Sequence, residues 1–141
     1  MSKHFRLFPT SSGVAAFLIA LSLCSCATLT KPSFQVRVQQ LKDAHLAFID
    51  HYTCAEGTPA KWNQASFDGE VTKITQQFMD AEAAESKAVP ARKTLIKNSA
   101  DVFQRDAALV RKKHCLGPSF AANKKNQLEQ NYDLLLRQTS T

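Results

Sequence analysis

Apolar residues recur at steps of three and four in four stretches of this chain, the spacing that lines one face of an α-helix. The clearest pattern lies between Pro90 and Cys115, where apolar doublets return every seven residues, as in a helix packed within a bundle. These doublets are Leu95-Ile96, Val102-Phe103 and Leu109-Val110. Only 4 Gly and 5 Pro occur among 141 residues, which leaves little material for the tight turns of an all-β protein. The sequence therefore predicts an all-α fold.

Prolines separate the other helical stretches. We expect these helices to run from about Phe34 to Tyr52, from Thr58-Pro59 to about Val89, and from about Ser119 to Arg137. Their inward-facing residues should include Phe34, Val38, Leu41, His45, Phe48, Tyr52, Phe67, Val71, Ile74, Phe78, Ala81, Leu128, Tyr132, Leu135 and Leu136. Gly69 favours a kink or a break in the second helix, and Gly117-Pro118 should end the third. Short loops between four amphipathic helices predict an antiparallel bundle over residues 34–138.

The beginning of the chain has the features of a targeting segment. Lys3 and Arg6 supply positive charge, and an apolar run from Val14 to Leu23 follows them. This run is too short to cross a bilayer comfortably, but it suits the hydrophobic part of a secretory signal. No other stretch is long and apolar enough to span a membrane, so we expect the rest of the chain to be soluble.

The signal ends in Leu23-Cys24-Ser25-Cys26, which resembles the lipobox of bacterial lipoproteins. The resemblance implies that residues 1–25 are removed, that Cys26 carries acyl chains, and that residues 26–33 form a flexible tether to the membrane. Ala27 follows the cysteine where Asp would signal retention, so in a two-membrane bacterium the family's sorting rule implies the outer membrane, facing the periplasm or, as an alternative, the cell surface. The alternative is an ordinary signal peptide cut after Ser25, with Cys26 left unmodified.

Two cysteines, Cys54 and Cys115, remain beyond Cys26. They form an even pair in an exported protein, where an oxidising compartment favours a disulfide. An antiparallel bundle also places the ends of its first and third helices on the same side, and the two cysteines stand at those ends. With His51 and His114 they could instead bind zinc, but adjacent residues such as His114 and Cys115 rarely aim at one ion. We therefore predict a disulfide, and neither a metal nor another cofactor.

The sequence contains no motif for phosphate binding, metal-dependent proteolysis or nucleophilic catalysis, so we do not expect an enzyme. His45 lies on an apolar stripe and is interpreted as a core or interface histidine. The acidic residues of the second helix are expected to form a solvated face. They are Asp68, Glu70, Asp80, Glu82 and Glu85.

The main expected surface feature is a cationic cluster near the junction of the third and fourth helices. It consists of Arg111, Lys112, Lys113, Lys124 and Lys125. The cluster could complement the helix dipole and aid solubility, or it could bind anionic lipid, lipopolysaccharide, peptidoglycan or an acidic protein. Nucleic acid is not expected as a partner, because the net charge of +6 is modest and no recognition motif is present. Trp62 is either a cap of the core or a binding hot spot.

These features favour a tethered, non-enzymatic helical module that binds and pilots or assembles an envelope protein. The layout is loosely similar to the helical pilotin lipoproteins of secretion systems, which carry a secretin by gripping one of its segments. The likeness lies in the architecture, a lipid-bearing Cys followed by one Cys that closes the first helix and another much later, and it carries over no binding residues. The alternative is an immunity or exclusion lipoprotein that neutralises a toxin, a phage component or a cell-wall hydrolase. A third interpretation is a bundle that contacts peptidoglycan.

Overall fold

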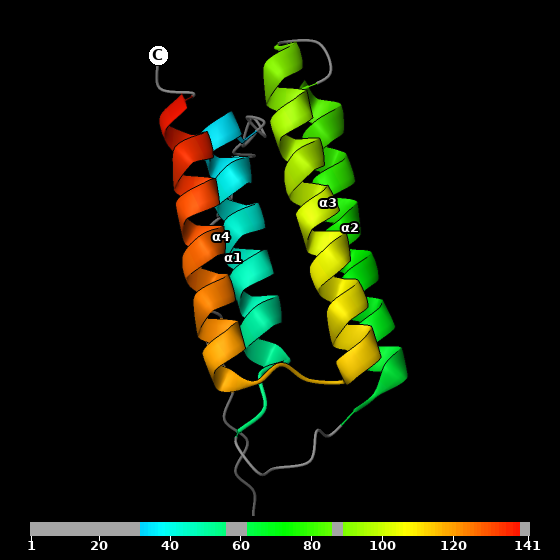
Figure 1. The fold of residues 1–141 in the computed structure, drawn as a ribbon. Helices are drawn as coiled ribbons and strands as arrows, with labels where there is room; N and C mark the ends of the chain where they lie inside the picture. Colours follow the sequence, from blue (N-terminus) through cyan, green and yellow to red (C-terminus); the bar gives the residue numbers. More distant parts are fainter. Residues whose placement is uncertain (1–31, 56–61, 86–88, 139–141) are drawn as a thin grey trace, which may run out of the picture. The chain divides into compact units, whose positions relative to one another are not determined.

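The computed structural model describes residues 32–55, 62–85 and 89–138. It contains four helices, α1 (Phe34–His51), α2 (Gln64–Glu85), α3 (Pro90–Lys113) and α4 (Pro118–Gln138) (Figure 1). The predicted all-α fold is confirmed. The signal segment, Cys26 with most of its tether, and the Thr58-Pro59 pair lie outside the described residues. None of the described helices is long and apolar enough to span a membrane.

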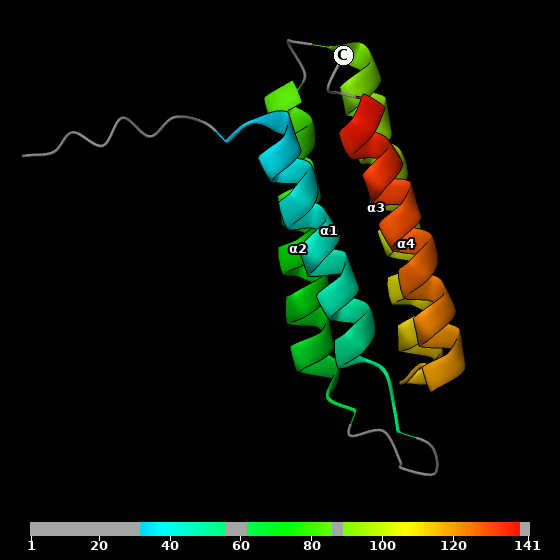
Figure 2. The same ribbon diagram turned by 90° about the vertical axis from the view of Figure 1, so that its left-hand side faces the viewer.

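Consecutive helices run in opposite directions, as predicted for an antiparallel bundle (Figures 1 and 2). Helix α1 packs along both α4 and α2, and α2 packs along α3. The backbones of α3 and α4 approach each other less closely than those of the three packed pairs. Both views show the end of α4 beside the beginning of α1, so one end of the bundle carries these two helix termini.

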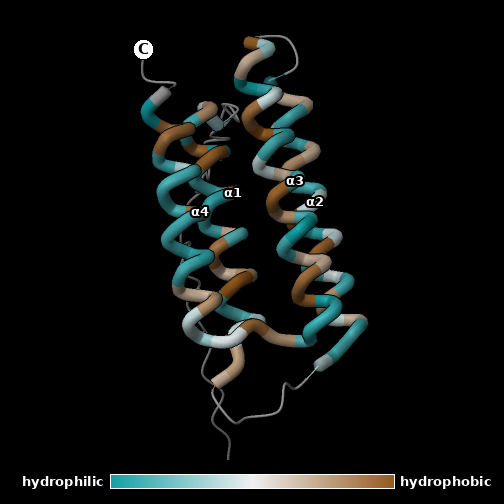
Figure 3. Tube along the Cα trace, in the orientation of Figure 1, coloured by the Kyte–Doolittle hydropathy of each residue, from teal (hydrophilic) through white to brown (hydrophobic). Residues whose placement is uncertain are grey.

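The core consists of the residues that the helical periodicity selects. Phe48, Phe67 and Phe103 are completely buried, and the Phe48 ring centroid lies 6.1 Å from that of Phe67 and 5.1 Å from that of Phe103. These contacts join α1 to α2 and α3. Hydrophobic positions recur among hydrophilic ones along each helix (Figure 3). The second residue of each α3 doublet is buried, and the first is only partly buried. The second residues therefore lie within the core, and the first residues lie at its edge. The buried members are Ile96, Phe103 and Val110.

Side-chain caps define where α1 and α2 begin. The Ser33 hydroxyl accepts a hydrogen bond from the Val36 backbone N–H, and the Asn63 side chain accepts one from Ser66. A cap of this kind satisfies a backbone donor that the first helical turn leaves unpaired. Helix α2 therefore begins at Gln64, later than we predicted, and it continues through Gly69 without the break we considered. Phe67 and Ile74 anchor the helix on both sides of this glycine.

Helix α3 ends earlier than predicted, and Gly117-Pro118 does not end it. His114 adopts a left-handed conformation with φ 63°, and its N–H donates to the Val110 carbonyl oxygen at 2.6 Å. The chain then turns toward α1, where Leu116 pairs with Thr53 in an isolated bridge. Pro118 begins α4 instead, because its missing N–H is not needed at a first helical position.

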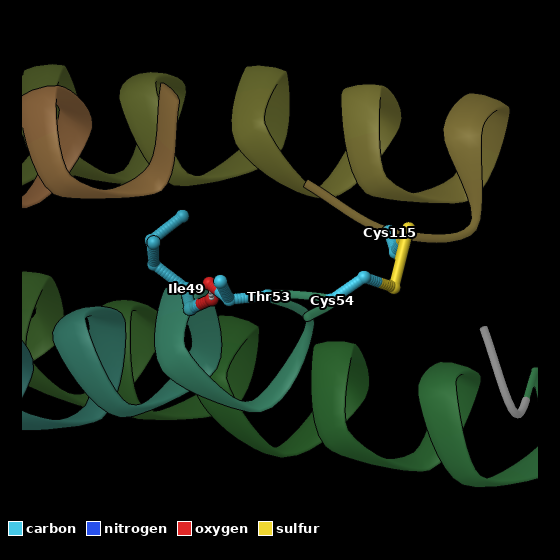
Figure 4. Close-up of a disulfide and its surroundings, with 4 residues drawn as sticks. All are labelled: Ile49, Thr53, Cys54 and Cys115. Atoms are coloured by element: carbon cyan, nitrogen blue, oxygen red, sulfur yellow. Dashed lines mark hydrogen bonds between the residues drawn. A yellow bond between two sulfur atoms is a disulfide. The ribbon is translucent and has the colours of Figure 1, made fainter. Parts of the chain in front are cut away.

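The predicted disulfide is present between Cys54 and Cys115, whose Cα atoms are 5.7 Å apart (Figure 4). It joins the segments that follow α1 and α3. Hydrogen bonds reinforce this junction, since the Cys54 N–H donates to the Leu116 carbonyl oxygen at 3.0 Å and the Leu116 N–H donates to that of Tyr52 at 2.7 Å. The Thr53 hydroxyl also donates to the Ile49 carbonyl oxygen at 2.7 Å. The two helix ends are thus held by covalent and hydrogen bonds together.

Candidate functional site

A groove of about 230 Å³ lies between α3 and α4, which are less closely packed than the α1–α4, α2–α3 and α1–α2 pairs. We call it the α3–α4 groove. Half of its lining residues are aliphatic, and Leu134 on its edge is 55% exposed. Exposed leucines beside an apolar groove are typical of a surface that binds a partner. The α3 wall consists of Leu95, Asn98, Ser99 and Val102, and the α4 wall consists of Leu128, Asn131, Tyr132, Leu134 and Leu135, with His45 reaching the groove from α1.

An ion pair below the groove fixes the register of its two walls. Lys124 of α4 lies 2.7 Å from Asp106 of α3, measured from Nζ to Oδ1. Because the helices are antiparallel, moving four residues from each partner pairs Val102 with Leu128. Moving a further seven residues pairs Leu95 with Leu135. The aliphatic side chains of the two walls therefore meet at two levels, about two helical turns apart.

A buried polar network underlies the groove. His45 is 0% exposed and Asp106 is 5% exposed. The Nε2 atom of His45 lies 3.0 Å from Asp106 Oδ2, and its Nδ1 atom lies 3.2 Å from the Tyr132 hydroxyl. Burial, assisted by the negative charge of Asp106, raises the pKa of Tyr132, so its hydroxyl keeps its proton. The network joins α1, α3 and α4 and leaves both ring nitrogens of His45 occupied.

His45 is therefore a core histidine, as its place on the apolar stripe indicated. Its ring packs edge-on against Phe103, with the ring centroids 5.3 Å apart. A general acid or base must come within hydrogen-bond reach of its substrate. A fully enclosed ring with two internal partners suits a structural role better.

The structure divides the predicted cationic cluster among several ion pairs. Arg111 pairs with Asp68 on α2 at 2.7 Å, and Lys125 pairs with Asp50 on α1 at 2.7 Å. Lys124 points toward the buried Asp106. Of the predicted cations, only Lys112 and Lys113 have no ion-pair partner within the described parts of the chain, and both are exposed. Three cations of the cluster therefore pair with acids on other helices, and only the Lys124–Asp106 pair is largely buried, whereas Arg111, Lys112 and Lys113 are exposed.

Trp62 covers the core at the end of the bundle that carries the disulfide. Its ring centroid lies 4.9 Å from that of Phe67, and it stacks on His114 at 4.4 Å. Tyr52 lies on the same cluster, 6.1 Å from Trp62. Trp62 is only partly buried, so one part of its surface still faces solvent. This position agrees with the interpretation of Trp62 as a cap of the core.

Sequence reasoning missed two buried acids, Asp106 and Glu85. We predicted that Glu85 would lie on a solvated face, and this was wrong, because Glu85 is 2% exposed and pairs with Arg37. Arg92 also approaches it at 4.0 Å. The signal was present in the spacing, since Glu85 lies four residues after the buried Ala81 and Asp106 lies three after Phe103. We expected charged residues to be exposed, whereas the helical periodicity would have placed Asp106 and Glu85 on buried faces.

Two other possible sites have weaker support. A cavity of about 310 Å³ between α1 and α2 has only one large aliphatic residue in its lining, Leu41. The zinc alternative lacks its thiolates, since both cysteines are in the disulfide. Within the described segments, no group of three or more His, Cys, Asp or Glu residues could hold a metal ion. The α3–α4 groove is the better candidate for a binding site.

The chain matches no protein-family model, and comparisons with curated proteins and with solved structures find no match. The interpretation of the groove therefore depends on the chain's own residues.

Proposed function

We propose that this chain is an outer-membrane lipoprotein whose helical bundle binds an apolar segment of an envelope protein and acts as a pilot or adaptor. The α3–α4 groove is the observation that carries the proposal. Its aliphatic lining includes the partly buried Leu95, Val102 and Leu135, and Leu134 stands exposed on its edge. Burying a leucine of this kind contributes about 1.5–3 kcal/mol. A few such contacts would hold a partner segment.

The proposed anchor keeps the groove close to the membrane. Cys26 precedes the first residue of α1, Phe34, by eight positions, and a fully extended chain of that length spans at most about 29 Å. An acylated Cys26 would therefore restrict the bundle to a layer near the bilayer surface. This restriction favours a partner that is itself part of the envelope and raises the local concentration of the two proteins.

Site-specific photo-crosslinking in cells would test the proposal. A photoreactive amino acid replaces Leu134 on the groove in one variant and Met79 on α2 in a control variant. The two residues are matched, since Leu134 is 55% exposed and Met79 is 57% exposed. We expect the Leu134 variant to crosslink one envelope protein through an apolar segment, and the Met79 variant to lack this product.

The identity of the crosslinked protein also separates the two candidate functions. An assembly component of the envelope supports the pilot or adaptor function. A toxin, phage component or cell-wall hydrolase would instead support the immunity function. Equal products from both positions, or none from Leu134, would contradict the groove as the binding site.

A further inference from the structure

The α3–α4 groove is not uniformly apolar along its length. Leu95 and Leu135 form one aliphatic level, and Val102 and Leu128 form the other. Between them the register set by the Lys124–Asp106 pair places a polar level. This level contains the amides of Asn98 and Asn131, and also the hydroxyls of Ser99 and Tyr132, which are already bonded to the Leu95 carbonyl oxygen and to His45. The groove thus presents two aliphatic levels separated by a belt of hydrogen-bonding groups.

The amides in this belt are available to a ligand. Asn98 and Asn131 are exposed, and neither side chain has a hydrogen-bond partner among the residues that the structure describes. No Asp, Glu, Lys or Arg is found among the described residues that line the groove. The belt therefore offers uncharged donors and acceptors to whatever occupies the groove.

The spacing of the aliphatic levels distinguishes a helix from a strand as the occupant. Leu95 and Val102 are seven residues apart on α3, or about 10 Å. A docked helix places residues i and i+7 at that distance on one face. A strand covers about 10 Å in three residues, and residues i and i+3 of a strand point to opposite faces. An acyl chain would match the aliphatic levels but leave the Asn98 and Asn131 amides without partners.

We infer that the groove accepts a partner helix that carries an uncharged hydrogen-bonding residue between two large aliphatic residues seven positions apart. This inference rests on the proposed function and adds the chemistry of the partner segment. A single polar residue in an apolar helix face fixes the register of packed helices, because a shift leaves its partner amides buried and unsatisfied. Asn98 and Asn131 would fix the register in this way.

Synthetic helical peptides can test the inference against the full, acylated chain in lipid nanodiscs. Each peptide carries Leu at positions i and i+7, with Asn, Leu or Glu at position i+4 and only Ala, Gln and Lys elsewhere. Affinity is measured by fluorescence anisotropy. For the unmodified chain we expect the Asn peptide to bind about tenfold more tightly than the Leu peptide, and the Glu peptide to bind most weakly.

The variant Asn98→Leu/Asn131→Leu should reverse the preference between the Asn and Leu peptides. Asn126→Leu is the control, because Asn126 is exposed on α4, as Asn131 is, but does not line the groove. Leu134→Ala should weaken the binding of all three peptides. Circular dichroism and sedimentation verify that each variant keeps the helical content and the oligomeric state of the unmodified chain.

A preference that the double variant leaves unchanged would overturn the inference. Absence of binding by all three peptides would also overturn it. Neither result decides the proposed function, which is judged by the crosslinks from Leu134. The crosslinked partner segment could instead have a charged or aliphatic residue between its two aliphatic residues. That result would support the proposed function but contradict the inferred chemistry of the partner segment.

Discussion

The Nε2 atom of His45 lies 3.0 Å from Oδ2 of Asp106 inside the core, joining α1 to α3. The other oxygen of the same carboxylate lies 2.7 Å from Lys124 on α4. One buried acid therefore has partners on two other helices. Buried polar groups cost free energy unless they are paired, so the three helices must keep one register for all of these contacts to form.

We predict that Asp106→Ala lowers the free energy of unfolding by about 3 kcal/mol. The substitution leaves His45 and Lys124 without their carboxylate partner, and His45 has no access to solvent. Urea unfolding followed by circular dichroism measures the change. Asp101→Ala is the matched control, because Asp101 is an exposed acid on the same helix. Equal losses in the two variants would show that the buried network contributes no specific stability.

The disulfide should contribute about 4 kcal/mol, because it closes a span of 61 residues in the unfolded chain. We predict that Cys54→Ala/Cys115→Ala lowers the melting temperature under non-reducing conditions. A reducing agent should lower the melting temperature of the unmodified chain to a similar value and leave the variant unaffected. Equal melting temperatures for the oxidised chain and the variant would show that the disulfide does not stabilise the fold. The hydrogen bonds that Leu116 makes with Cys54 and Tyr52 should still connect the ends of α1 and α3 in both cases.

The fold could be predicted from sequence because its strongest determinant, helical periodicity, is local. The doublets of α3 and the apolar residues of α1 predicted which faces are buried, and the bundle topology predicted which cysteines meet. Helix ends were less predictable, since His114 ends α3 in a left-handed conformation usually left to glycine. The end of α3 depends on the Thr53–Leu116 bridge and the disulfide, which are contacts between distant parts of the chain.

The candidate site was harder to predict than the fold. The groove forms because α3 and α4 are held apart in register, and the sequence gives no measure of that separation. Leu128 and Tyr132 were correctly assigned to the core, and both are 2% exposed, but nothing in the sequence indicated that Asn98 and Asn131 lie beside them at a groove. The cationic cluster was visible, but the acids that pair with Arg111, Lys124 and Lys125 lie on other helices. A run of charged residues can be recognised from the local sequence, whereas the acids that neutralise it are brought near only by the folding of the chain.

Glu85 and Glu82 provide a direct comparison of a buried and an accessible acid near the end of α2. Glu85 is 2% exposed and pairs with Arg37 and Arg92, whereas Glu82 lies near the surface, 3.6 Å from Lys93. We predict that Glu85→Ala lowers the free energy of unfolding by about 3 kcal/mol, because it removes the buried carboxylate that neutralises the partly buried Arg37. Glu82→Ala should cost less than about 1 kcal/mol. Urea unfolding would contradict this ranking if the two variants had equal stability.

Tyr52 should make the protein sensitive to alkaline pH. Burial, together with a hydrogen bond to Glu70 and the negative charge of that residue, raises the pKa of Tyr52 from 10.0 to about 12. The unfolded chain loses this proton first as the pH rises above 10.0, so the stabilising contribution is complete below that pH and is lost as the pH rises toward about 12. We predict that Tyr52→Phe reduces the alkaline loss of stability in urea unfolding.

The same contact predicts the direction of a spectroscopic change. Glu70→Gln removes the negative charge beside the phenol and should lower the pKa of Tyr52 toward its ordinary value. Phenolate absorbance follows the titration, and the chain has only 2 Tyr, so Tyr52→Phe identifies which transition belongs to Tyr52. An unchanged titration in Glu70→Gln would show that Glu70 has no influence on the phenol.

Cys26 and Cys24 allow a matched test of the proposed anchor. We predict that Cys26→Ala abolishes recovery of the processed protein with membranes, because the side chain that would receive the acyl chains is gone. The product should be either an unprocessed precursor or a soluble domain. Cys24→Ala should be processed and anchored normally, since Leu-Ala-Ser-Cys retains an aliphatic residue and two small ones before Cys26. Fractionation and intact-mass measurement distinguish these products. Anchoring that is lost in Cys24→Ala but retained in Cys26→Ala would move the lipid to Cys24, and anchoring retained in both variants would remove the lipid from the proposed mechanism.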